Sequence, residues 1–425
     1  MTVNWAWWRR WTVLLSGLAC LQLAVQACNA VTGFLLVRWL PREEYSLFTL
    51  TGSLLTLMVL FTDLGLTVGL VSIGGRVWAD RARHAALVAD GVLLRRQLYI
   101  VTALVMAPVG YWLLRRTGAE PLQSGWLMAL VLAAGGLAAS ASVHASVVRL
   151  HGRHRAVQVA ELAGSAVRLL ASAAGVTVAA LALVATSAVA LSQAVFGARL
   201  RRTSAELLGP LATPTGEHRR DLLATLRTLA PTAIFHSVQG QVTTFLLVLL
   251  GTSGQVADLG AISRYQIVFG VCGVILAQVV TPAAARATDP AHYRRLLRTT
   301  LLGYAAYSLA AIAAAWLLRR PALALLGAQY LGLRDELILL MFSAALGGLN
   351  GLLWNFVSAR NWIRHVWVII PLTLAAQVVL ALWLPLDTVS GALVFGAFST
   401  LPATLWFSVL GIVRFNKNQS FTSCQ

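Results

Sequence analysis

Residues 158–199 read QVAELAGSAVRLLASAAGVTVAALALVATSAVALSQAVFGAR, an almost unbroken run of Ala, Val and Leu. A helix needs roughly 20 mainly apolar residues to cross a hydrocarbon layer about 30 Å thick, so this run is long enough to cross twice. We therefore expect two membrane-spanning helices joined by a tight turn near Val178. The predicted fold class is an all-α integral membrane protein.

The rest of the 425-residue chain has the same character, with 58% hydrophobic and only 11% charged residues. A soluble domain carries about 25% charged side chains, which excludes two or three ordinary soluble domains. Apolar runs of spanning length recur, and we expect about twelve transmembrane helices. They are placed at residues 12–37, 46–73, 97–114, 125–148, 158–178, 180–199, 230–251, 260–281, 299–318, 335–358, 366–384 and 388–413.

The basic residues indicate the orientation of these spans. The chain has 33 Lys and Arg against 15 Asp and Glu, a formal net charge of +18, and every base except Lys417 is Arg. These bases form short clusters between apolar runs, a distribution that favours membrane topology and not nucleic-acid binding. Most of them lie in the loops that share a side with the N-terminus. Because cytoplasmic loops are enriched in Lys and Arg, both termini are expected in the cytoplasm.

The longest hydrophilic stretch divides the expected spans into two six-helix lobes. We assign residues 1–205 to an N-terminal lobe, 206–229 to a cytoplasmic amphipathic linker and 230–425 to a C-terminal lobe. The linker ends in RRDLLATLRTLAP, a segment that would place its leucines on one helical face. Such a helix either lies on an anionic inner leaflet or is a solvated connection, and both interpretations stay open. The leucines concerned are Leu222, Leu223, Leu226 and Leu229.

Polar side chains within apolar spans are the candidate functional residues, since they are costly there. The expected fifth span carries Glu161, Ser165, Arg168 and Ser172 on one helical stripe. An Arg facing lipid at the centre of a span costs roughly 2.5–3.5 kcal/mol on insertion scales, so Arg168 should face a wet cavity or a carboxylate. Asp63, deep in the second span, and Glu161 are the candidate partners. Such a pair would either serve transport or only lock helices together.

Further polar stripes occur in the first and seventh spans and favour a polar lumen between the halves. The first span contributes Gln26 and Asn29. The seventh contributes His236 and Gln239. Singly, such groups are more often interhelical hydrogen bonds. Arg264, near the outer end of the eighth span, is a candidate that could equally snorkel to the interface.

At the inner end of the fourth span, the segment RLHGRHR (149–155) offers several positive charges. It could receive a phosphate, although the inside bias of basic residues explains it more simply. No P-loop, dinucleotide fingerprint, HExxH or GxSxG motif is present, so neither an enzyme nor a nucleotide cofactor is expected. The four cysteines form no ligand spacing, so no metal site is expected either.

Four segments carry a resemblance to a known family. They are VRWLPREEYSLFTL (37–50), FTDLGLTVGLVSIGGR (61–76), VVTPAAARATD (279–289) and LLGAQYLGLRDELILL (325–340). Together they resemble the polysaccharide-biosynthesis flippases, which include the Wzx-type O-antigen transporters. That family belongs to the MOP superfamily, which also holds the multidrug and toxic-compound (MATE) exporters and the peptidoglycan lipid flippases.

The resemblance implies two six-helix lobes around a central cavity in a bacterial inner membrane. It also implies a cargo, an undecaprenyl-diphosphate-linked oligosaccharide that moves from the cytoplasmic to the periplasmic leaflet by alternating access. The pathway's polymerase and glycosyltransferases are then possible partners besides the lipid bilayer. No cofactor is expected, but transport could be coupled to H⁺ or Na⁺ through Asp63 or Glu161.

Two alternatives remain open. A cation-coupled multidrug exporter of the same superfamily would favour surplus carboxylates within the spans, whereas here Arg168 and Arg264 balance Asp63 and Glu161. A membrane polysaccharide polymerase or ligase would resemble chains with a large periplasmic loop. The longest outer loop expected here, about 318–335, is too short for that reading.

Overall fold

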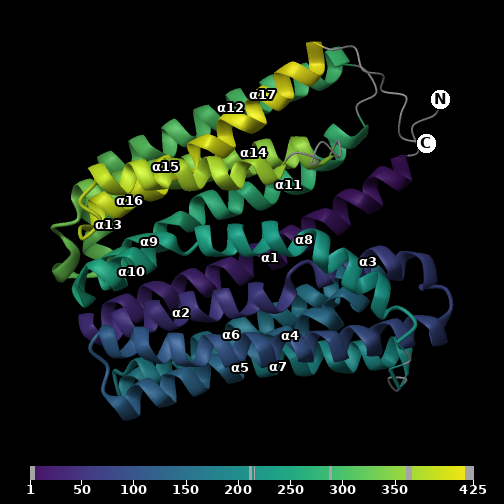
Figure 1. Cartoon of the computed structure of the whole chain (residues 1–425), viewed down its shortest axis with the longest axis horizontal. Coiled ribbons are helices and arrows are strands. Elements are labelled where there is room, and N and C mark those ends of the chain that lie inside the picture. The colour runs from purple at the N-terminus through teal and green to yellow at the C-terminus, as the bar shows by residue number, and fades with distance from the viewer. Residues whose placement is uncertain (1–4, 210–212, 215, 287–289, 360–365, 417–425) are drawn as a thin grey trace. The chain divides into compact units, whose positions relative to one another are not determined.

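The structure is a computed structural model that describes residues 5–209, 213–214, 216–286, 290–359 and 366–416 (Figure 1). These residues are almost entirely helical and contain no strand, which confirms the predicted all-α class. The end of the segment 279–289 that supported the family resemblance lies outside the described residues.

The helices form two compact units, Met1–Gln241 and Val242–Gln425. The first contains α1 (Trp5–Trp39), α2 (Arg42–Asp63), α3 (Leu66–Val77), α4 (Arg81–Arg116), α5 (Pro121–Leu150), α6 (His154–Val178), α7 (Ala182–Leu208) and α8 (Arg219–Gln239). The second contains α9 (Val242–Leu250), α10 (Ser253–Ile262), η1 (Ser263–Gln266), α11 (Ile267–Arg286), α12 (Pro290–Leu317), α13 (Arg319–Leu326), η2 (Ala328–Tyr330), α14 (Arg334–Ala359), η3 (Val366–Val368), α15 (Ile369–Trp383), α16 (Val389–Ser399) and α17 (Leu401–Asn416).

Many of these helices are long and apolar enough to cross a bilayer. The described residues contain nine such spans, or ten if α8 and α9, which are bent by 53° at their junction, form one. The apolar helix α15 is shorter. The chain is therefore a multi-pass membrane protein, and the expected total of about twelve spans stays a prediction.

The turn expected near Val178 is confirmed, because α6 ends at Val178 and α7 begins at Ala182. Ala179 and Leu181 between them have extended backbones. Glu44 of α2 fixes the start of α7, since its carboxylate accepts the Ala182 N–H at 2.7 Å. The same carboxylate accepts the Gln123 amide of α5 at 2.9 Å. One acidic side chain thus aligns the ends of three helices, and its negative charge suits the positive N-terminus of α7.

In the first unit, α5 packs against α4 and α7, and α6 packs between α7 and α1. Helix α8 also belongs to this unit and contacts α2, α3 and α4. The residue at which we expected the C-terminal lobe to begin, 230, therefore falls inside a helix that packs on the first unit. Its N-terminus is held by the buried carboxylate of Asp90, which accepts the N–H groups of Gly216 at 2.9 Å and His218 at 3.2 Å.

The second unit is built around α14, which contacts α11, α12, α16 and α17. Tyr304 of α12 reaches α14 and donates its hydroxyl to the Ala345 carbonyl at 2.9 Å. Gly348 makes room for this ring, because a Cβ there would lie 2.0 Å from the Tyr304 oxygen. Small residues thus let these helices approach closely, as is usual where the surrounding lipid supplies no hydrophobic drive for association.

The orientation can be tested with single cysteines in a chain whose four native cysteines are replaced by serine. Val178 at the α6 end is 87% exposed, and Arg153 before α6 is also exposed. In intact bacterial cells, Val178→Cys should react with a membrane-impermeant maleimide, whereas Arg153→Cys should react only after lysis. The reverse pattern would show that the termini lie outside.

Candidate functional site

The second span is interrupted between α2 and α3. Leu64 has a φ of 41° and Gly65 a φ of 90°, and Leu64 is the one non-glycine residue with positive φ among those the structure describes. Leu229 of α8 packs directly on Gly65, where a Cβ would lie 2.7 Å from the Leu229 Cδ1. Both the backbone angle and this contact therefore require glycine. The break frees backbone carbonyls at the end of α2, which need other partners.

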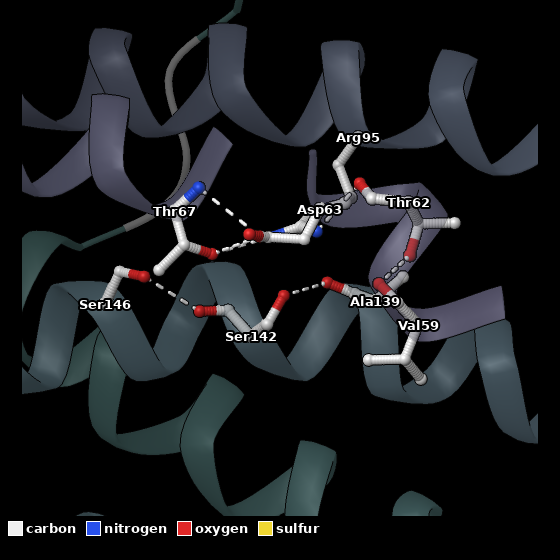
Figure 2. A network of polar contacts seen from close by, with 8 residues as sticks. All are labelled: Val59, Thr62, Asp63, Thr67, Arg95, Ala139, Ser142 and Ser146. Atoms are coloured by element: carbon white, nitrogen blue, oxygen red, sulfur yellow. Dashed lines mark hydrogen bonds and ion pairs between the residues drawn. The ribbon is translucent and has the colours of Figure 1, made fainter. Parts of the chain in front are cut away.

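Arg95 of α4 supplies those partners (Figure 2). Its Nη1 donates to the Thr62 carbonyl at 2.8 Å, and its Nη2 donates to the Asp63 carboxylate at 2.7 Å and to the Thr67 hydroxyl at 3.0 Å. The residue is only 3% exposed. Burying a guanidinium costs several kcal/mol unless a counter-charge and hydrogen bonds offset it, and this site provides both. One side chain therefore holds both sides of the break.

Asp63 is the counter-charge, and it also caps α3. Its carboxylate accepts the Thr67 N–H at 3.3 Å and a short hydrogen bond from the Thr67 hydroxyl. A helix is partly positive at its N-terminus and partly negative at its C-terminus, so Asp63 at the start of α3 and Arg95 at the end of α2 both match the helix dipoles. The Asp63 side chain is 30% exposed, so its carboxylate is not fully enclosed by the first unit. We call Thr62, Asp63, Thr67 and Arg95 the break cluster.

Helix α5 passes beside the break cluster and carries Ser142 and Ser146 (Figure 2). Their hydroxyls donate to the carbonyls of Ala139 and Ser142 within α5, at 2.8 and 2.9 Å. They consequently make local hydrogen bonds along their own helix. The hydrogen bonds that reach the break from a different helix therefore come from Arg95 of α4.

The structure gives Asp63 a partner that the sequence analysis did not offer. Sequence reasoning offered Arg168, but the ion pair forms with Arg95. Arg95 falls between the expected spans 46–73 and 97–114, where clustered bases usually lie in a loop, whereas α4 begins much earlier, at Arg81. A signal was present in the sequence: Leu87, Val88, Gly91 and Leu94 form an apolar helical stripe, and Arg95 continues it.

Arg168 and Glu161 lie on α6, both half-buried. The same helix face carries Ser165 and Ser172, which are buried, so the predicted stripe does not face lipid throughout. Glu161 lies within the field of the Arg149 charge on α5. Helix α6 packs against α1, which carries Gln26 and Asn29, likewise half-buried. The predicted polar residues of the first and fifth spans are thus on neighbouring helices.

The other predicted residues lie on other helices. His236 is exposed on α8, with its ring edge-on to Phe235 at 5.6 Å. Gln239 ends the same helix, half-buried. Arg264 lies half-buried in η1 of the second unit. Within the part of the chain that the structure describes, no three His, Cys, Asp or Glu side chains come together as a metal site requires.

The break cluster makes a prediction about stability. Arg95→Ala should destabilise the protein by about 3 kcal/mol, because it leaves Asp63 and the Thr62 carbonyl without their partner. The adjacent Arg96, which is exposed, is the matched control, and Arg96→Ala should leave the thermal unfolding midpoint nearly unchanged. Thermal unfolding of both variants in detergent measures the difference. Equal midpoints would show that Arg95 does not hold the break.

We compared this fold with those of known proteins. No protein-family model matches the chain, and no curated protein matches it. Among solved structures, an inward-facing multidrug resistance MATE family transporter of the MOP superfamily has a TM-score of 0.77 at 15% identity, over 95% of this chain and 100% of that chain. The lipid II flippase MurJ, in an inward closed conformation, has a TM-score of 0.75 at 10% identity, over 92% of this chain and 86% of that chain.

A third match is a MOP superfamily transporter from Pyrococcus furiosus Vc1, with a TM-score of 0.67 at 16% identity over 95% of each chain. These identities are too low for anything beyond the fold to be inferred from the likeness. The narrower resemblance to O-antigen flippases stays a prediction. The chain has the fold of the MOP superfamily transporters.

Proposed function

We propose that this protein is a flippase that moves an undecaprenyl-diphosphate-linked oligosaccharide from the cytoplasmic to the periplasmic leaflet of a bacterial inner membrane. The fold is shared with a lipid II flippase over most of both chains, which supports a lipid-linked cargo. The observation that carries the proposal is Arg168, a half-buried arginine midway along the spanning helix α6.

The chemistry of such a cargo fits an arginine. A sugar diphosphate is anionic and strongly hydrated, so its passage requires a wet path with fixed positive charge while the polyprenyl tail remains in lipid. The planar guanidinium donates paired hydrogen bonds to phosphate and stays charged at any cellular pH. Gln26 and Asn29 on the neighbouring α1 add amide groups that suit sugar hydroxyls.

Coupling to H⁺ or Na⁺ is part of the proposal, and the structure bears on which carboxylate takes part. Asp63 is engaged by Arg95 and Thr67, so a cation would have to compete with a guanidinium there. Glu161 is half-buried on the same helix as Arg168 and is the better-placed group. Uptake of a cation at Glu161 would then alter the field near the cargo-binding arginine.

A second candidate is a cation-coupled multidrug exporter. The TM-score of 0.77 with a MATE family transporter, over the whole of that chain, favours it on fold alone. The two functions differ in the sign of the cargo, and a central Arg168 repels a cationic drug. We therefore place the exporter second.

The test compares variants of Arg168 in cells that depend on this protein for surface polysaccharide. Arg168→Ala should insert normally but reduce polymer display by at least about tenfold, since charge-assisted hydrogen bonds to phosphate are each worth roughly 1.5–3 kcal/mol. Arg168→Lys should retain part of the activity. Arg220, exposed on α8, is the control, and its alanine variant should display normal polymer.

Purified protein in proteoliposomes separates the two candidates. The flippase should translocate undecaprenyl diphosphate bearing a fluorescent oligosaccharide and should not transport a cationic dye. Dye transport without lipid translocation would identify an exporter. Full polymer display by Arg168→Ala would remove Arg168 from the cargo path.

A further inference from the structure

Six arginines surround the predicted inner ends of α5, α6 and α7. They are Arg149, Arg153, Arg155, Arg199, Arg201 and Arg202, all exposed, and we call them the arginine cluster. They are brought together by a buried apolar contact, in which Val148 of α5, Val157 of α6 and Leu200 of α7 pack in one core. Each arginine is within four residues of one of these buried positions in the sequence, so the charges border a single small core.

Few acidic groups compensate these charges. Between residues 140 and 209 the sequence contains only Glu161 and Glu206. Glu206 pairs with Arg153 at 3.7 Å, an exposed contact, and its backbone carbonyl accepts from Arg81 at 3.5 Å. Glu161 lies within α6 and in the field of Arg149 alone among the six arginines. Like charges so close together repel, and a mobile anion bound among them removes that repulsion.

An exposed tryptophan next to the arginine cluster indicates its depth relative to the membrane. Trp78, at the end of α3, is 53% exposed, and its ring lies edge-on to His151 at 6.4 Å. His151 is in the turn between α5 and α6, between Arg149 and Arg153 in the sequence. Exposed Trp is typical of the membrane–water interface, where lipid headgroups lie. The tryptophan and the arginines together fit a headgroup: an aromatic ring beside the acyl boundary and guanidinium groups for phosphate.

We propose that the arginine cluster binds an anionic phospholipid of the inner leaflet that carries two phosphates, the chemistry of cardiolipin. Basic sites at the cytoplasmic ends of transmembrane helices bind such headgroups. Each guanidinium can grip one phosphate with paired hydrogen bonds, and three helix ends offer enough arginines to hold two phosphates at once. This site is distinct from the cargo-binding residues on α6 and does not rest on the proposed function.

The test uses the purified full-length protein in detergent-free nanodiscs made of phosphatidylcholine, a zwitterionic lipid. Tetraoleoyl cardiolipin is added as the probe. Replacing Arg199, Arg201 and Arg202 together by Gln should weaken cardiolipin binding by at least about tenfold, since each arginine near an anionic surface contributes roughly fivefold to affinity and three are removed. The matched control replaces Arg294, Arg295 and Arg298 of α12, also exposed, by Gln. This control removes the same charge and should bind cardiolipin nearly as the parent does.

Each result decides the proposal. Equal loss in both triple variants would overturn it, because the effect would then follow net charge alone. No loss in either would also overturn it, because the arginine cluster would then not bind cardiolipin. Phosphatidylglycerol supplied at the same total phosphate concentration should bind more weakly than cardiolipin. Equal binding of the two lipids would overturn the two-phosphate assignment. Tighter binding of undecaprenyl diphosphate than of cardiolipin at this cluster would make it a site for cargo instead.

Folding of the variants is checked by thermal unfolding before lipid is added. If the α7 triple variant does not fold, Arg149→Gln combined with Arg155→Gln tests the α5–α6 side of the same cluster. The assay measures equilibrium binding and needs no transport. Its failure therefore leaves the flippase proposal standing, and failure of the flippase proposal leaves this one standing.

Discussion

A polypeptide that interrupts a helix within a membrane must find new hydrogen-bond partners for the backbone groups that the interruption frees, because lipid offers none. In this protein the interruption falls after Asp63, and the positive φ values of Leu64 and Gly65 redirect the chain there. Arg95 provides the missing donors from a different helix. The α2–α3 break, the position of α4 and the packing of α8 on Gly65 are therefore parts of one arrangement.

Much of this fold follows from composition and periodicity. The turn between α6 and α7 was predictable because two bilayer crossings need about forty apolar residues, and residues 158–199 supply them. Asp63 could be singled out, since a carboxylate within an apolar run is rare. Its partner could not be found by the same rule, because Arg95 stands in a cluster of bases that resembles a loop. Only the apolar stripe of α4 distinguishes it from the exposed Arg96.

The amphipathic pattern of residues 219–229 could likewise be predicted from the sequence, but the surface that its leucine face contacts could not. Leu222 is fully buried, and it packs on α3 near Gly69, where a Cβ would lie 3.3 Å from its Cδ2. A leucine face fits a lipid surface and a glycine-lined helix equally well, and periodicity does not tell the two apart. The features that make this face pack on protein are Gly65 and Gly69, which lie far from it in the sequence. The same limit applies to cargo: a multidrug exporter and a lipid II flippase share this fold, so the arrangement of helices does not by itself distinguish a cation from a diphosphate.

Helix α8 has an unusual position in the chain. It is continuous with the second unit, which begins at Val242, yet it packs against the first and is capped there by Asp90. The connection that precedes it includes Thr213 and Pro214, both exposed. A protease that cuts this connection would therefore leave two fragments of nearly equal length that stay associated, because α8 belongs to the carboxyl-terminal fragment and packs against the amino-terminal one. If the two halves were expressed as separate chains divided at this connection, we expect them to associate through the leucine face of α8.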